Sequence, residues 1–247
     1  MFAALSPFEE QETAMFRAEA EWLQNLLRLQ SREALSPMLN IGSSTQAFRE
    51  QQQPWTERCI FEPLKARGVR VLHLDNKDGM GIDIRADILN PAELPRLKAL
   101  APKSVLCCNI LEHVPDPAAL ANICMEIVGP GGLIFVTVPF SYPHHRDPID
   151  TMYRPRPHEL AALFRPATML NGEIISAGES WWNDVGKRPW ILLRPLLRLP
   201  FPFVDFPGWK RSMRRVYWLW HQYRVTAALF QVPASPRAVV DMGGSGG

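Results

Sequence analysis

The N-terminal part of the chain has an apolar stripe at helical spacing. Ser6, followed by Pro7 and Glu9, is typical of a helix start, because serine caps the first turn and proline suits the first helical position. Apolar side chains then recur every three or four residues, at Met15, Phe16, Trp22, Leu23, Leu26 and Leu27. The pattern predicts one helix with a buried face that ends before Pro37.

From residue 38 onward, short apolar runs alternate with helical patterns. The runs predicted as strands cover residues 38–41, 69–74, 82–84, 104–108, 133–138 and 171–177. Helices are predicted over residues 57–67, through Leu94, Leu97 and Leu100, and over residues 117–128 and 158–164. Uniformly apolar strands that alternate with helices are typical of a parallel sheet covered on both faces. The sequence therefore predicts an α/β protein with a doubly wound, mostly parallel sheet.

The regular pattern ends near Trp181. Residues 183–235 form a basic and aromatic stretch that prolines interrupt, so we expect a C-terminal extension of helical and irregular structure. Residues 236–247 are rich in glycine, and we expect a flexible tail there. The N-terminal helix at residues 1–36 and the sheet domain at residues 37–182 complete the predicted organisation.

Composition adds one asymmetry to this picture. The 247 residues are 47% hydrophobic and 21% charged, and the net charge of +2 argues against a dedicated nucleic-acid binder. Residues 187–230, however, hold nine basic side chains and a single acidic one, Asp205. The four cysteines lack metal-ligand spacing, so no metal site is predicted. The sequence shows neither a signal peptide nor a long apolar run, and we expect a cytoplasmic protein.

Small and polar residues follow the predicted strands at their carboxyl ends, where open parallel sheets bind ligands. The most specific run is Asn-Ile-Leu-Glu-His-Val-Pro-Asp-Pro at residues 109–117, after the fourth strand. Pro-Gly-Gly at residues 130–132 precedes the fifth strand, and Val-Thr-Val-Pro lies at residues 136–139. Over about residues 39–164 this order resembles the class I S-adenosylmethionine-dependent methyltransferases. Within that family it is similar to a type 11-like subgroup with the Leu-Glu-His-Val signature.

The resemblance implies a seven-stranded Rossmann-like methyltransferase sheet with S-adenosylmethionine as its cofactor. It also implies methyl transfer to a small-molecule or sugar-like acceptor, at oxygen. Gly42 would let the backbone approach the methionine part of the cofactor, and Ser43 follows it in the same turn. Asp75, at the end of the second strand, would accept hydrogen bonds from the ribose hydroxyls.

Further cofactor contacts follow from the same resemblance. Asp87 would accept a hydrogen bond from the adenine amino group, and Ile88 would pack on the base. Asn109 and the Leu111 backbone would line the methyl-donor site. Each of these residues taken alone is equally compatible with a structural role, for example capping a helix or a turn; together they favour a cofactor site.

The turn after the first strand departs from the family pattern. The family has two or three glycines there, whereas this chain has Gly42 followed by Ser43, Ser44 and Thr45. This departure leaves open a second hypothesis, a catalytically inactive methyltransferase-like binding or scaffold protein. A nicotinamide-dependent oxidoreductase is disfavoured, because no Gly-x-Gly-x-x-Gly follows the first strand.

The loop after the fifth strand carries candidate acceptor-side residues. We predict His145 as the general base, with His144 as a second candidate, because imidazole exchanges protons near neutral pH. Asp147 or Asp150 would orient the imidazole, and Asp150 and Arg154 are the candidates for contact with the acceptor. The alternative for this loop is a proline-stiffened lid whose polar side chains satisfy their own backbone.

Three hypotheses remain open for the function of the basic and aromatic residues 187–230. Arginine and aromatic side chains are enriched where proteins pack against one another, which favours a homo-oligomer contact or a lid over the acceptor. Basic residues beside Trp and Phe also suit peripheral contact with a membrane surface. Nucleic-acid binding is less favoured, because the segment is more apolar than basic. The partners expected are therefore a small-molecule acceptor, a second copy of the chain or a membrane surface.

Overall fold

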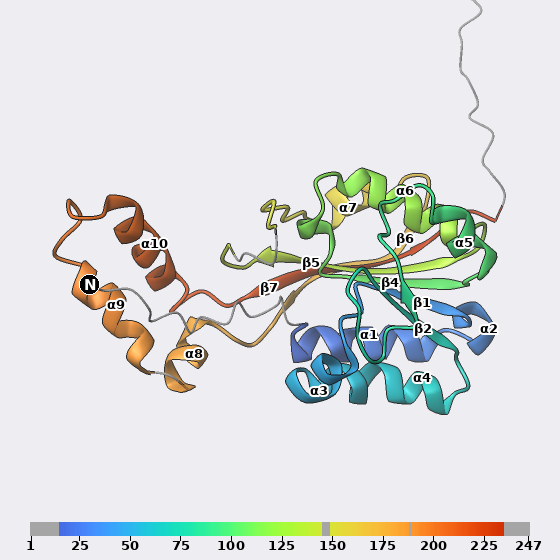
Figure 1. The fold of residues 1–247 in the computed structure, drawn as a ribbon, viewed down its shortest axis with the longest axis horizontal. Helices are drawn as coiled ribbons and strands as arrows, with labels where there is room; N and C mark the ends of the chain where they lie inside the picture. Colours follow the sequence, from blue (N-terminus) through green and yellow to red (C-terminus); the bar gives the residue numbers. More distant parts are fainter. Residues whose placement is uncertain (1–14, 145–148, 188, 235–247) are drawn as a thin grey trace, which may run out of the picture.

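The computed structural model describes residues 15–144, 149–187 and 189–234. A seven-stranded sheet with the order β3-β2-β1-β4-β5-β7-β6 forms its centre (Figure 1). Six of its strands run parallel, and β7 pairs antiparallel with both β5 and β6. The strands are β1 (Met38–Ile41), β2 (Val71–Asp75), β3 (Ile84–Arg85), β4 (Ser104–Cys108), β5 (Leu133–Ser141), β6 (Thr168–Ser176) and β7 (Arg224–Gln231).

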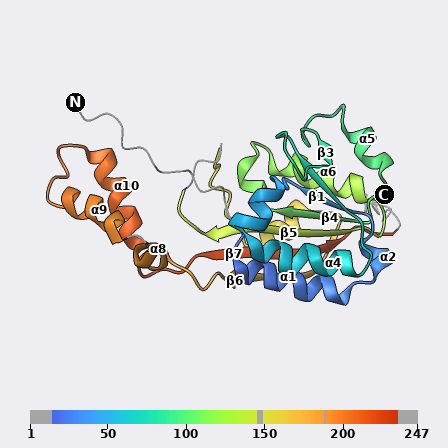
Figure 2. The same cartoon turned by 60° about the horizontal axis from the view of Figure 1, so that its bottom comes forward.

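Helices cover both faces of this sheet, as the alternation of elements predicts. Figures 1 and 2 show α5, α6 and α7 on one face and α1 to α4 on the other. The α-helices are α1 (Arg17–Leu29), α2 (Arg32–Leu35), α3 (Pro54–Thr56), α4 (Glu62–Ala66), α5 (Leu94–Ala99), α6 (Pro117–Val128), α7 (Pro157–Leu163), α8 (Trp181–Lys187), α9 (Leu193–Arg198) and α10 (Phe206–Tyr217). Two short π-helices, η1 (Phe48–Gln52) and η2 (Glu57–Phe61), and two short 3-10 helices, η3 (Leu111–His113) and η4 (Pro189–Leu192), complete the set.

The strands send alternate side chains into two separate cores. In β5, Ile134, Val136 and Val138 pack with α5, α6 and α7, whereas Leu133 and Phe135 pack with α1 and α4. β4 divides in the same way, because side chains alternate along a strand. Burial on both faces explains why these strands are apolar throughout the sequence.

Most predicted elements are confirmed with small shifts at their ends. β1, β4 and α6 have the expected bounds, and α6 begins where the Asp116 carboxylate accepts hydrogen bonds from the N–H groups of Ala118 and Ala119. β3 is only two residues long, and β5 extends to Ser141. The predicted N-terminal helix is found as α1 and α2, and its expected start at Ser6 lies outside the described residues.

One expectation from the sequence needs correction, namely the C-terminal extension over residues 183–235. The structure places Arg224–Gln231 inside the sheet as β7, between β5 and β6. The chain therefore leaves the sheet after β6, forms α8, α9 and α10, and returns as β7. We call residues 177–223 the insertion. The strand was missed because the proline-broken stretch before it masks a short apolar run, whose pairing partners lie far away in sequence.

The insertion projects away from the sheet domain at one end (Figure 1). It has a small core of its own, formed by Ala177, Trp181, Val185 and Tyr223 with partly buried neighbours. An aromatic contact joins it to the domain: the ring centroids of Phe16 and Tyr223 lie 5.8 Å apart, and those of Tyr142 and Tyr223 lie 4.9 Å apart. No helix among the described residues combines the length and the apolar character that a membrane span requires.

Candidate functional site

The loop after β1 comes first at the carboxyl edge of the parallel strands. Gly42 is exposed and has a φ of +65°, a conformation that side chains disfavour. A Cβ on this residue would lie 2.7 Å from Cδ1 of Ile110, so a larger residue would have to displace that side chain and adopt a strained backbone conformation. The next residue, Ser43, is buried, and its hydroxyl donates to the carbonyl of Ser44. At Gly42 the backbone itself therefore lies at the sheet edge, because this residue has no side chain.

A buried arginine holds this loop in place. Nη1 of Arg49 donates to the carbonyls of Ser43 and Ser44, at 3.0 and 2.7 Å, and Nη2 donates to the carbonyl of Gly81 at 2.9 Å. Burial lowers the pKa of this guanidinium from its ordinary value. Arg49 thus ties the loop after β1 to the loop that precedes β3.

A substitution at Gly81 tests how tightly these two loops pack. Gly81 has a φ of +81°, and a Cβ there would lie 2.5 Å from Cβ of Gln46 and 2.9 Å from Nη2 of Arg49. We expect Gly81→Ala to lower the free energy of unfolding by about 2 kcal/mol or more, from backbone strain plus a clash. Gly131→Ala is the matched control, because Gly131 has a φ of +80° with nothing within 4 Å. Equal losses in urea unfolding would contradict the tight contact.

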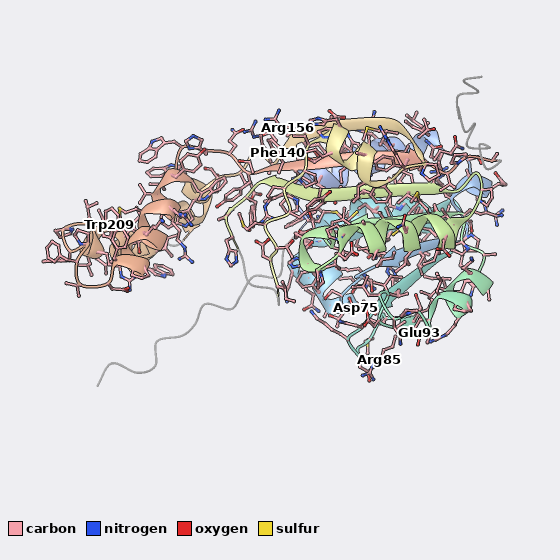
Figure 3. The ribbon with its side chains drawn as sticks, turned by 90° about the horizontal axis from the view of Figure 1, so that it is seen from above. Asp75, Arg85, Glu93, Phe140, Arg156 and Trp209 are labelled. Atoms are coloured by element: carbon pink, nitrogen blue, oxygen red, sulfur yellow. The ribbon has the colours of Figure 1, made fainter. Side chains whose placement is uncertain are left out.

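Asp75 occupies the end of β2, beside the same loop. Its carboxylate accepts hydrogen bonds from the backbone N–H of Ser44 at 2.8 Å and of Lys77 at 3.0 Å. One oxygen takes each bond, so both oxygens keep lone pairs for further donors. Asp75 is largely buried, and Figure 3 labels it within the sheet domain. The structure thus gives this carboxylate a fixed orientation at the sheet edge.

The predicted adenine contacts lie on the adjoining loop. Asp87 is exposed and accepts a hydrogen bond from the backbone N–H of Leu89 at 3.0 Å, which is a local turn interaction. Ile88 is half-buried and packs against the core on the α5 and α6 side. Both positions therefore remain predictions, with Asp87 already engaged in its own turn.

Asn109 has a partner that the sequence did not predict. Its φ is +54°, and its side-chain N–H₂ donates to Oε1 of Glu19 at 3.0 Å. The Thr137 hydroxyl on β5 donates to the same oxygen at 2.5 Å, and the backbone N–H of Phe16 donates to Oε2 at 3.2 Å. Glu19 is fully buried, and burial raises the pKa of this carboxyl to about 7. α1 is therefore fastened to the carboxyl ends of β4 and β5 through one carboxyl group.

Glu112 is a second buried carboxyl at this edge, in the Leu-Glu-His-Val run. It is fully buried, like Leu111 beside it, and neither carboxyl oxygen has a hydrogen bond among the described residues. Nε2 of His113 lies 3.7 Å from Oε1. Burial raises the pKa of Glu112 to about 8, against the opposing charge of Arg154. A buried carboxyl without a hydrogen bond is costly, so it marks this position as a functional candidate.

The acceptor-side residues are only partly described. His144 is exposed in the loop after β5, and His145 and Asp147 lie outside the described residues. Asp150 and Arg154 pair with each other, with Nη2 2.7 Å from Oδ2. Thr151 anchors this segment, because its N–H and its hydroxyl both donate to the carbonyl of Glu112. The structure therefore brings the acceptor-side segment against the Leu-Glu-His-Val run.

Sequence reasoning missed Glu19 and Arg49, and it did not single out Glu112 as a candidate. A signal for Glu19 was present: it lies three residues after Phe16 and four before Leu23, on the apolar face of the predicted helix. An acidic side chain on such a face predicts a buried polar contact. No local pattern marks Arg49. Among the described residues, no three His, Cys, Asp or Glu side chains are grouped to hold a metal ion.

Comparisons with known proteins find distant sequence relatives. No protein-family model matches the sequence. A ubiquinone biosynthesis O-methyltransferase of Leptothrix cholodnii is 27% identical over 154 residues, which cover 51% of this chain and 58% of that protein. One of Acinetobacter baumannii (strain AYE) is 28% identical over 134 residues, which cover 49% of this chain and 55% of that protein. The chain thus spans little more than half the length of these curated relatives.

Solved structures show the same architecture. Coclaurine N-methyltransferase, in a crystal structure bound to N-methylheliamine and S-adenosylhomocysteine, superposes with a TM-score of 0.50 at 14% identity. The match covers 91% of this chain and 75% of that one. The strand order with β7 antiparallel is therefore the Rossmann-like fold of S-adenosylmethionine-dependent methyltransferases. The sequence relatives reported above are named as O-methyltransferases.

Three features of the edge suit S-adenosylmethionine. Gly42 is exposed and carries no side chain, and Asp75 has free lone pairs for the hydroxyl donors of a ribose. Oδ1 of Asn109 is a buried acceptor with no partner among the described residues. Each lies at or just after the carboxyl end of a parallel strand, where ligands bind in open α/β sheets. The residues present therefore fit the cofactor.

Proposed function

We propose that this protein is an S-adenosylmethionine-dependent methyltransferase that acts on a hydroxyl oxygen of a small-molecule acceptor. The observation that carries the proposal is the strand order together with Asp75, a buried carboxylate held beside the Gly42 turn. The oxygen acceptor is favoured by the relatives that are named ubiquinone biosynthesis O-methyltransferases. The Leu-Glu-His-Val run favours the type 11-like subgroup.

The chain's residues divide into two groups in this proposal. Gly42, Ser43 and Asp75 hold the cofactor, with Asp87 and Ile88 at its adenine and Asn109 and Leu111 at the donor methyl. The cofactor supplies a methyl group that is already activated on a sulfonium. The protein therefore has to align the acceptor, exclude water and remove one proton.

A histidine in the loop after β5 takes that proton. We propose His145 as the base, with His144 as the second candidate and Asp147 as the group that orients the imidazole. Bound S-adenosylmethionine would supply the methyl group to the acceptor oxygen and would leave as S-adenosylhomocysteine. The acceptor proton passes to the imidazole. Arg154, held by Asp150, contacts the acceptor from the anchored segment beside Glu112.

Turnover with labelled cofactor tests this function. Purified full chain is incubated with methyl-labelled S-adenosylmethionine and with a phenol, a sugar or an amine, and both the labelled product and S-adenosylhomocysteine are measured. We expect labelling of a hydroxyl acceptor that falls at least about a hundredfold in His145→Ala, because a general base contributes about that much. His158→Ala is the matched control, because this histidine lies on α7, outside the loop.

The other outcomes separate the alternatives. Labelling of the amine alone would contradict an oxygen acceptor, and full turnover in His145→Ala would move the base to another residue. Cofactor binding without turnover on any acceptor would favour the catalytically inactive binding protein. If the protein shows no cofactor binding and no turnover, the proposed function is overturned.

A further inference from the structure

The insertion exposes an unusual number of apolar side chains. Eight of them lie within fourteen residues, from the start of α9 to the start of α10, and each is more than half exposed. We call them the apolar strip: Leu193, Leu196, Leu197, Leu199, Phe201, Phe203, Val204 and Phe206. Phe203 is 81% exposed. Scattered apolar residues are normal on protein surfaces, whereas so many exposed apolar side chains within one short segment mark a candidate interaction surface.

The architecture of the insertion explains why this strip has no cover within the described chain. Its small core is formed by α8, the ends of the insertion and parts of η4 and α10. Figure 1 shows α8, α9 and α10 extending away from the sheet domain, so the domain cannot bury the strip. The helices are short, and single helices without a covering layer leave their apolar faces in solvent.

Positive charge accompanies the strip. The insertion contains eight Lys or Arg residues and three acidic residues. Lys210 and Arg214 are exposed one helical turn apart on α10. Asp205, the acidic residue nearest to them in sequence, caps α10 through the N–H of Gly208 and pairs with Arg198. Exposed Tyr217 and Trp220 follow the cations, and Trp220 is 75% exposed.

We propose that the apolar strip and the cations of α10 dock the protein peripherally on an anionic phospholipid membrane. Apolar side chains would enter the boundary between headgroups and acyl chains, and Lys210 and Arg214 would bind lipid phosphates. Tyr and Trp at the rim suit the membrane–water interface. A second copy of the chain fits less well, because a symmetric contact would place two positively charged surfaces against each other.

The place of the insertion in the fold gives this docking a consequence. The insertion begins after Ser176 and ends before Arg224, and both are paired in register at the Ser141 end of β5. That end is the carboxyl edge of the parallel strands, where the candidate site lies. Figure 3 shows Phe140 where the insertion joins the domain and Trp209 far out on the insertion. Docking would therefore hold the carboxyl edge toward the lipid surface, whichever reaction the site performs.

Vesicle flotation with the full chain tests the proposal. Vesicles of phosphatidylcholine alone are compared with vesicles that also contain phosphatidylglycerol, at low and high salt. We expect flotation with the anionic vesicles that weakens with salt. Lys210→Gln with Arg214→Gln should lower the partition coefficient about 25-fold, since each cation near an anionic surface contributes about fivefold. Arg96→Gln with Lys98→Gln removes the same charge from α5 and should leave binding unchanged.

An apolar pair of variants separates insertion into lipid from attraction of charge. Phe203→Ser should lower the partition coefficient about tenfold or more, because a buried Phe side chain is lost from the membrane. Leu29→Ser is the matched control: Leu29 is 78% exposed at the end of α1, outside the insertion. Thermal unfolding checks that all variants fold, which we expect because every substituted side chain is exposed.

Three results would overturn the assignment. The first is a wild-type chain that floats with neither vesicle, and the second is flotation that Phe203→Ser leaves intact. The third is a stable dimer in light scattering, converted to monomer by Phe203→Ser, with no vesicle binding; the occupant of the strip would then be a second copy. Flotation is measured without cofactor or acceptor, so failure of the proposed methyl transfer does not affect this test.

Discussion

Replacing Asp75 by asparagine is expected to weaken the binding of S-adenosylhomocysteine about a hundredfold or more. Asparagine keeps a single acceptor oxygen, and its N–H₂ would face the backbone N–H of Ser44 or Lys77. The variant loses a charge-assisted hydrogen bond to the ribose and also loosens the loop after β1. Calorimetric titration of the purified protein measures the change in Kd.

A neighbouring carboxylate provides the control for this prediction. Asp78 lies three residues further along the chain, and its side chain is 85% exposed next to Arg85. Asp78→Asn makes the same chemical change without a predicted role in the cofactor site, and we expect an unchanged Kd. If folded Asp75→Asn binds as tightly as the wild type, the carboxylate has no part in cofactor binding.

The stability that two buried carboxyls contribute is expected to fall as the pH rises from about 4.5 to about 8. Burial raises the pKa of Glu19 from 4.5 to about 7 and that of Glu112 from 4.5 to about 8. In this range the folded protein holds protons that the unfolded chain releases, so rising pH favours unfolding. The stabilising contribution of these protonated carboxyls is complete at pH values below 4.5, their pKa in the unfolded chain. It is lost as the pH rises past their pKa values in the folded protein. The shift at Glu112 alone corresponds to a loss on the order of 5 kcal/mol.

Urea unfolding of three proteins over a pH series measures this dependence. Glu112→Gln removes the titrating group without breaking a hydrogen bond to the side chain, since its oxygens have none among the described residues. We expect the variant to resemble the wild type near pH 5 and to be more stable by several kcal/mol near pH 9. Glu21→Gln, at an exposed position on α1, is the control and should keep the wild-type slope. Parallel slopes for Glu112→Gln and the wild type would show that Glu112 ionises normally.

These two carboxyls show where prediction from sequence stopped. Glu112 lies in a recognisable run, but whether its side chain is buried depends on residues 149–154 folding over it. Glu19 reaches Asn109 and Thr137, which are 90 and 118 residues away in the chain. Hydrogen bonds over such separations follow from the packing of α1 against the sheet. The helical pattern of the N-terminal residues predicts that α1 packs somewhere, and it does not predict against which strands.

The sheet shows the same division. Apolar runs and their turn residues predicted β1, β2, β4 and β5, because a strand buried on both faces needs apolar residues along its whole length. β7 escaped prediction, since its place between β5 and β6 requires the chain to leave the sheet for the whole insertion and return. The same topology turns a supposed C-terminal extension into a projection held at both ends by the sheet.

The sequence by itself determined the α/β class, most of the strands and the residues that follow them, including Gly42 and Asp75. These features are local, because periodicity, capping and turn chemistry act over a few residues. Only the tertiary structure decided that Arg49 clamps two loops together, that Glu19 and Glu112 are buried at one edge, and that the apolar strip stays in solvent. The reason is physical: burial, pKa and exposure depend on which distant segments pack together, and that packing is a property of the whole fold.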